Sequence, residues 1–62
     1  MNMESVNAMD INILLSMVNM RLRDEFSSLE RLCDDWNISE EELKTKLRKI
    51  GYEYNSEINQ FK

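Results

Sequence analysis

Hydrophobic residues recur every three or four positions through most of this chain, which is the spacing of one face of an α-helix. The longest such segment spans residues 10–26. At 100° per residue, six of its hydrophobic side chains fall within one arc of about 120°. They are Ile11, Leu14, Leu15, Val18, Leu22 and Phe26. Asp10 precedes them and predicts an N-cap. We expect this helix to be the element against which the rest of the chain packs.

The same helix carries a second hydrophobic stripe on nearly the opposite side. Ile13, Met17 and Met20 follow one another at i, i+4 and i+7. A helix that is hydrophobic on two sides is usually central, or lies between its own domain and a partner. Two arrangements are open: the C-terminal segment covers these three side chains, or they bind a protein partner or a second copy.

A shorter helix is predicted after Ser27. Ser27, followed three residues later by Glu30, has the spacing of a capping box. The hydrophobic face of the helix is formed by four residues at i, i+3, i+4 and i+7, namely Leu29, Leu32, Cys33 and Trp36. Asn37 tolerates the left-handed conformation and is expected to end the helix.

The next helix is predicted over residues 40–50. Ser39 is its expected N-cap and is followed by three glutamates, which favour the positive end of a helix dipole. Leu43, Leu47 and Ile50 form its inward stripe. Gly51 supplies a left-handed residue after its last turn.

Residues 51–62 predict a short β-hairpin, because Tyr52 and Tyr54 alternate with Glu53 before a polar turn at residues 55–57. Two strands alone are marginally stable in water, so the hairpin must pack against the helices. At the other end of the chain, residues 1–9 are predicted to be a flexible N-terminal tail. Residues 10–62 are predicted to be one small helical domain.

The two shorter helices have the spacing of a helix-turn-helix. Cys33 is the small residue of the first helix, Asn37 the turn residue, and Leu43 the branched residue that holds the pair together. The expected fold is therefore mainly α: a three-helix domain with a helix-turn-helix-like corner and a short C-terminal β-hairpin, in the order of a small winged helix.

Composition narrows the functions that this fold can serve. The chain has 62 residues, a net charge of −4, one cysteine and no histidine. No disulfide within the chain is possible, and a lone cysteine without histidine makes neither a zinc site nor a Cys–His nucleophile. We expect no enzymatic activity, no metal and no cofactor. The longest hydrophobic runs have three residues and no signal peptide is visible, so we expect a cytoplasmic protein that does not span a membrane.

Nucleic-acid binding is the alternative function, because the two shorter helices have the spacing of a helix-turn-helix. The residues that would face a groove or its phosphates are Lys44, Thr45, Arg48 and Lys49. Glu40 and Glu41 lie at the end of the helix that usually enters the groove, and carboxylates repel phosphate. The acidic net charge also disfavours a large phosphate footprint. We expect Glu40–Lys44 and Glu42–Lys46 to pair at i, i+4 on a solvated face.

Two segments resemble a known family. The sequences LLSMVNMRLRDEFSSLERLC (residues 14–33) and GYEYNSEINQF (residues 51–61) resemble a family of short bacterial proteins described as a domain of unknown function. Its members share an LSMVN–LRD–SL–LC stretch and a closing GYxYxxxxNQF. The resemblance implies a bacterial origin and carries over no activity, ligand or catalytic residue.

Within these segments, Asn19 and Arg23 stand at i, i+4 on the long helix. We expect both side chains to bond to the backbone of the closing hairpin near Asn59. The function that fits the pattern best is a small non-enzymatic interaction module, self-associating or binding a protein partner through Ile13, Met17 and Met20. The alternative is a helix-turn-helix nucleic-acid-binding regulator.

Overall fold

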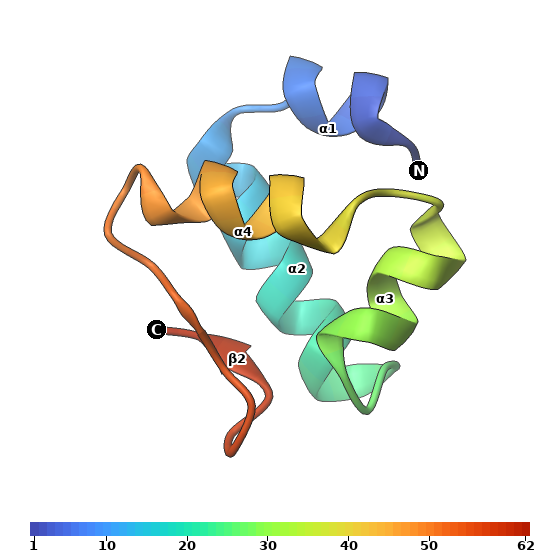
Figure 1. Cartoon of the computed structure of the whole chain (residues 1–62), viewed down its shortest axis with the longest axis vertical. Helices are drawn as coiled ribbons and strands as arrows, with labels where there is room; N and C mark the ends of the chain where they lie inside the picture. The colour runs from blue at the N-terminus through green and yellow to red at the C-terminus, as the bar shows by residue number, and fades with distance from the viewer.

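The computed structural model describes all of residues 1–62 and shows four helices followed by a two-stranded hairpin (Figure 1). The elements are α1 (Met3–Ala8), α2 (Ile11–Asp24), α3 (Leu29–Trp36), α4 (Glu40–Arg48), β1 (Tyr54–Asn55) and β2 (Gln60–Phe61). The prediction of a mainly helical domain with a C-terminal β-hairpin is confirmed.

Helix α2 is the central element, as its pattern predicted. Leu14, Val18 and Leu22 on its inward face are buried, and α3, α4 and β2 all pack against it. In Figure 1, α4 crosses in front of α2, while α3 and the hairpin flank its lower half. Asp10 caps the first turn by accepting hydrogen bonds from the backbone N–H groups of Asn12 and Ile13, so the predicted start of this helix is confirmed.

The hydrophobic core takes side chains from every helix and from β2. Eleven residues form one buried cluster: Val6, Leu14, Val18, Leu22, Leu29, Leu32, Cys33, Trp36, Leu43, Leu47 and Phe61. No polar or charged residue is buried among them. Phe61 of β2 is only 2% exposed. The last strand is therefore part of the core.

The corner between α3 and α4 follows the predicted scheme. Asn37 adopts the left-handed conformation with φ 56°, and its N–H bonds to the carbonyl of Asp34 while that of Ile38 bonds to Cys33. This pair of bonds is the Schellman ending of a helix. Ser39 then caps α4 by accepting from the N–H of Glu42, 3.3 Å away.

Helix α4 ends in the same way. Gly51 has φ +85°, its N–H bonds to Arg48, and that of Tyr52 bonds to Leu47. The left-handed turn at Gly51 reverses the chain, so that it runs back towards α2 as the hairpin. The predicted helix end is confirmed, although Tyr52 itself remains exposed.

The first nine residues differ from the expected tail. Residues 3–8 form helix α1, which Asn2 caps by accepting a hydrogen bond from Ser5, and Val6 is fully buried in the core. Asparagine is a favoured N-cap residue, and Asn2 stands directly before the hydrophobic positions Met3 and Val6. Met9 is extended, with ψ 146°, and this break separates α1 from α2.

The predicted cap of α3 is wrong by one residue. Ser28, not Ser27, precedes the helix and accepts a hydrogen bond from the N–H of Arg31 at 3.2 Å. Phe26 still bonds back to Arg21 at the end of α2, so Ser27 is needed to turn the chain. The shift makes Leu29 the first residue of α3, with its side chain in the core.

The hairpin pairs Tyr54 with Phe61 and Asn55 with Gln60. Reciprocal backbone bonds between Glu53 and Lys62 extend the ladder by one further pair. The rings of Tyr54 and Phe61 lie on one face, 5.5 Å apart between centroids. This aromatic pair gives the two short strands a hydrophobic face to set against the helices.

Candidate interaction surface

One flank of α2 holds the hairpin through a side-chain amide. Asn19 donates from Nδ2 to the carbonyl of Phe61 at 3.0 Å and accepts from the N–H of Phe61 at 2.7 Å. Gln60 donates from Nε2 to the carbonyl of Asn19 at 2.9 Å. The amide of Asn19 thus pairs with the main chain of β2 as a neighbouring strand would, and it fixes the hairpin on this flank.

A second set of bonds joins the hairpin to the loop between α2 and α3. Asn59 donates to the carbonyls of Leu22 and Phe26, at 2.9 and 2.8 Å, and accepts from the hydroxyl of Tyr54 at 2.6 Å. That hydroxyl accepts in turn from the N–H of Leu29 at 3.3 Å. Two hairpin side chains therefore satisfy backbone groups left free where α2 ends and where α3 begins.

The expectation that both Asn19 and Arg23 reach the hairpin is half confirmed. Asn19 does so, but Arg23 instead pairs with its neighbour Asp24 at 3.0 Å, with 69% of its side chain exposed. The hydrogen bond from Arg23 lowers the pKa of Asp24 below its ordinary value. On the helix, Arg23 is rotated about 40° further from the hairpin than Asn19, which directs its longer side chain into solvent.

Sequence reasoning missed the roles of Tyr54, Asn59 and Gln60. Asn59 has φ 53°, a left-handed conformation in which asparagine is common, and this places its amide against the end of α2. The only signal in the sequence was the closing GYxYxxxxNQF of the family resemblance, which contains all three residues.

The hairpin leaves uncovered the side of α2 that faces away from the core. Ile13 is 57% exposed and Met20 is 43% exposed, while Met17, between them, is partly buried and packs against the core. The three side chains of the second stripe are therefore not equivalent, and the C-terminal segment does not cover the stripe. Only Ile13 and Met20 remain as a hydrophobic pair that faces solvent.

The residues around this pair are polar and exposed. Asn12 and Ser16 lie on the hairpin side of the face, and Arg23 and Asp24 lie at its C-terminal end. We name the surface formed by these four residues together with Ile13 and Met20 the outer face of α2. It is a small hydrophobic centre within a polar rim.

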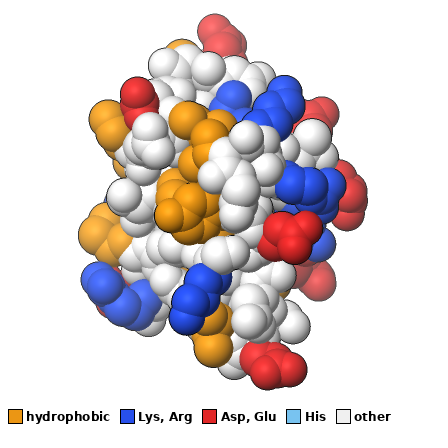
Figure 2. Space-filling view, turned by 90° about the vertical axis from the view of Figure 1, so that its left-hand side faces the viewer, with side chains coloured by type: hydrophobic (Ala, Val, Ile, Leu, Met, Phe, Trp, Pro, Cys, Tyr) orange, Lys and Arg blue, Asp and Glu red, His pale blue; other side chains and the backbone are white.

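The surface of α4 is mixed in charge. Lys44 pairs with Glu40 at 3.3 Å, as predicted, and Arg48 pairs with Glu53 at 3.6 Å. The predicted pair between Glu42 and Lys46 does not form. In Figure 2, positive and negative side chains are interspersed along the right-hand side of the face shown. Thr45 and Lys49 are exposed beside them, but no continuous basic stripe separates the cations from the acids.

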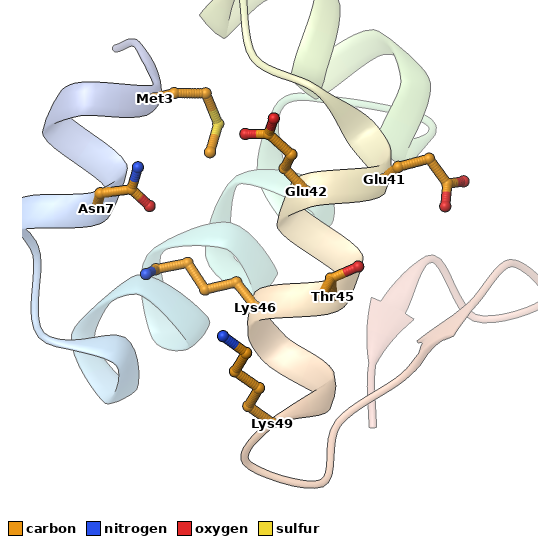
Figure 3. A pocket seen from close by; sticks show the side chains of 7 residues that line it. All are labelled: Met3, Asn7, Glu41, Glu42, Thr45, Lys46 and Lys49. Atoms are coloured by element: carbon orange, nitrogen blue, oxygen red, sulfur yellow. The ribbon is translucent and has the colours of Figure 1, made fainter.

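A shallow hollow of about 270 Å³ lies between α1 and α4. Figure 3 shows Lys46, Lys49 and Glu42 reaching from α4 towards the α1 side of the hollow, while Glu41 points away. Met3 and Asn7 border it from α1. The residues that border this open hollow include two cations and two carboxylates, so the charges of its border cancel.

Cys33 is 4% exposed. Burial, helped by the nearby charge of Glu40, raises the pKa of its thiol from 9.0 to about 11. A protonated, enclosed thiol is a poor nucleophile. No group of three or more His, Cys, Asp or Glu side chains comes together in a way that could hold a metal ion.

We call Asn19, Tyr54, Asn59 and Gln60, which join the hairpin to α2, the clamp residues. They lie within a recognised family domain, as do the corner between α3 and α4 and the outer face of α2. A family model described as a domain of unknown function (DUF4250) matches residues 8–61. The chain belongs to this family. The resemblance seen in the sequence is thereby confirmed, and the matched range includes α2, α3, α4 and the hairpin. No curated protein and no solved structure matches the chain. None of its helices has both the length and the hydrophobicity to cross a membrane.

Proposed function

We propose that this protein is a small non-enzymatic interaction module that associates with a second copy of itself through the outer face of α2. The observation that carries the proposal is the exposure of Ile13 and Met20 on the most central helix of the domain. The hairpin could have covered them, but Asn19 holds it on another flank.

The chemistry of the chain supports a binding role over a catalytic one. There is no histidine for proton transfer near neutral pH, and the one thiol is buried and protonated. Asp10 is already used to cap α2. The hollows on the surface are open and lined mainly by polar residues.

The outer face also suits a weak association. A stable protein interface buries about 800 Å² on each partner, which is a large share of the 4127 Å² that this small domain exposes. The outer face, with two half-exposed hydrophobic side chains and a polar rim, offers a much smaller area than such an interface buries. We therefore expect a dimer in rapid exchange with the monomer, populated in the range of about 0.1–1 mM.

Sedimentation equilibrium over this concentration range tests the proposal. The natural chain should show an average mass that rises above that of the monomer, whereas Ile13→Glu and Met20→Glu should stay monomeric because a charge would have to be buried. Ile58→Glu is the matched control, since Ile58 is 49% exposed but lies in the hairpin turn. A monomer at every concentration, or equal effects of all three variants, would contradict the proposal.

A second candidate function rests on the corner between α3 and α4. The left-handed Asn37 and the capped start of α4 resemble the turn of a helix-turn-helix, whose second helix lies in the major groove of DNA. The candidate residues are Lys44, Thr45, Arg48 and Lys49. Two of them already pair with carboxylates, which weakens their attraction for phosphate.

Binding to duplex DNA at low salt, followed by fluorescence anisotropy, tests this alternative. A regulator of this kind should bind with steep salt dependence, and the double variant Lys44→Ala, Arg48→Ala should bind more weakly. Glu41→Gln is a useful counterpart, because removing its repulsion should strengthen binding. The absence of binding at about 50 mM salt would exclude this function.

A further inference from the structure

We propose that residues 1–9, which contain α1, form a detachable lid on the core. The lid opens and closes as one unit, while α2, α3, α4 and the hairpin stay folded. This property concerns a single chain and does not depend on the proposed self-association.

The lid is attached to the rest of the domain by hydrophobic contacts alone. Val6 is fully buried, and Met3 and Met9 are partly buried and pack against the core. The other residues of α1 are exposed. No hydrogen bond or ion pair joins residues 1–9 to residues 10–62. The hairpin, in contrast, is held to α2 by side-chain hydrogen bonds of Asn19 and Asn59.

The hydrogen bonds of the lid close within the lid itself. Asn2 accepts from the N–H groups of Ser5 and Val6, and the N–H of Met9 donates to the carbonyl of Val6. A helix of six residues is unstable in water on its own, so the lid unfolds when it leaves. Opening therefore gives up the burial of a few hydrophobic side chains and regains the conformational entropy of the segment. The cost is much smaller than that of unfolding the whole domain.

The junction between α1 and α2 lets the lid move without disturbing α2. Met9 has ψ 146° and Asp10 has ψ 132°, so neither residue is helical. The side chain of Asp10 caps α2 by accepting from the N–H groups of Asn12 and Ile13. This cap uses no group of the lid. The first turn of α2 therefore stays formed when the backbone rotates at Met9.

Opening uncovers one edge of the core beside α4. Met3 and Asn7 of the lid border the hollow that Lys46 and Lys49 border from α4 (Figure 3). When the lid leaves, the position that Val6 fills in the core becomes accessible, together with this side of α4. The family domain begins at residue 8, so most of α1 lies outside it. The lid thus controls solvent access to a part of the core that the family domain itself supplies.

Hydrogen exchange of the natural chain in low concentrations of urea tests the lid, at a protein concentration below that of the proposed dimer. The amide of Val6 reports on the lid, and those of Leu22 and Leu47 report on α2 and α4. We expect the Val6 amide to be protected about 10- to 100-fold, and at least about tenfold less than the other two. Its rate should hardly change with urea because opening exposes little surface, whereas theirs should rise steeply.

Two results would overturn the proposal. Equal protection and equal urea dependence at Val6, Leu22 and Leu47 would mean that α1 leaves only when the whole domain unfolds. Exchange of the Val6 amide at the rate of an unstructured peptide would mean that the lid does not close.

Thiol labelling gives a second readout that does not depend on backbone amides. Val6→Cys places a thiol at the buried point of the lid, and Cys33, which is 4% exposed in α3, is the reference within the same chain. We expect an aromatic disulfide reagent to label the introduced thiol at least about tenfold faster than Cys33. Asn7→Cys is the matched control, because this exposed position should react at once in the closed state. Equal labelling rates at the introduced thiol and at Cys33 would contradict the lid.

Discussion

The side-chain amide of Asn19 makes two hydrogen bonds with the main chain of Phe61, which lies 42 residues further along the chain. One amide thus joins the central helix to the last strand with the donor and acceptor pattern of a strand partner. The ring of Phe61 enters the core at the same place. Because this contact occupies one flank of α2, it decides which flank remains available for a partner.

Asn19→Ala should lower the free energy of unfolding by about 2 kcal/mol, because both the N–H and the carbonyl of Phe61 lose a part-buried partner. Arg23→Ala is the control on the same helix and should change it by less than about 0.5 kcal/mol, since its side chain is 69% exposed. Urea denaturation measures both. Equal losses in the two variants would mean that Asn19 does not hold the hairpin.

Tyr54→Phe should cost about 1 kcal/mol of stability. The variant keeps the ring that packs against Phe61 but loses the hydroxyl that links Asn59 to the first N–H of α3. Thermal unfolding followed by circular dichroism gives the shift. Tyr52→Phe is the control, because Tyr52 is exposed and lies only two residues before Tyr54. It should leave the midpoint of thermal unfolding unchanged. If both variants behaved alike, the hydroxyl of Tyr54 would have no structural role.

Val6→Ala tests whether residues 1–9 belong to the domain. Val6 is fully buried, and removing two of its carbons from a packed core should cost about 2 kcal/mol. Asn7→Ala, at the exposed next position of α1, should cost less than about 0.5 kcal/mol. A flexible N-terminal tail, as first predicted from the sequence, would instead make both substitutions neutral.

Stability should fall at high pH because of Cys33. Its pKa is about 11 in the folded chain against 9.0 ordinarily, so the folded state holds the thiol proton more tightly than the unfolded state. The contribution of Cys33 to the free energy of unfolding is therefore complete below pH 9 and is lost between about pH 9 and 11, by about 3 kcal/mol. Urea denaturation of the natural chain and of Cys33→Ala, under reducing conditions, isolates this contribution. Parallel pH profiles of the two chains would contradict it.

Much of the helical architecture could be predicted because its determinants are local. The left-handed Asn37 and Gly51, and the caps at Asp10 and Ser39, depend only on residues a few positions away. The cap of α3 was misplaced because two serines stand side by side, and the choice between them depends on how α2 ends. Local patterns predict that a helix begins, but they do not always select its first residue.

The clamp between the hairpin and α2 could be predicted only in part. Asn19 and Arg23 are both polar residues on the central helix, and both were predicted to bond to the hairpin. Asn19 does so, but Arg23 points into solvent. Their difference of about 40° around the helix matters only once the position of the hairpin is known. Asn59 and Tyr54 act over 25 to 37 residues, beyond the reach of any spacing rule. The split of the second stripe, with Met17 partly buried, depends on packing in the same way.

Hydrogen exchange at the backbone amide of Phe61 tests the central contact most directly. This amide belongs to a hairpin with two residues in each strand, which alone would be marginally stable in water and would exchange rapidly. Because it donates to Asn19, it should be protected by at least a hundredfold, and Asn19→Ala should abolish that protection while the amide of Leu22 stays protected. Free exchange of the Phe61 amide in the natural chain would contradict the claim that Asn19 holds β2 against α2. It would also remove the reason for placing a partner on the outer face.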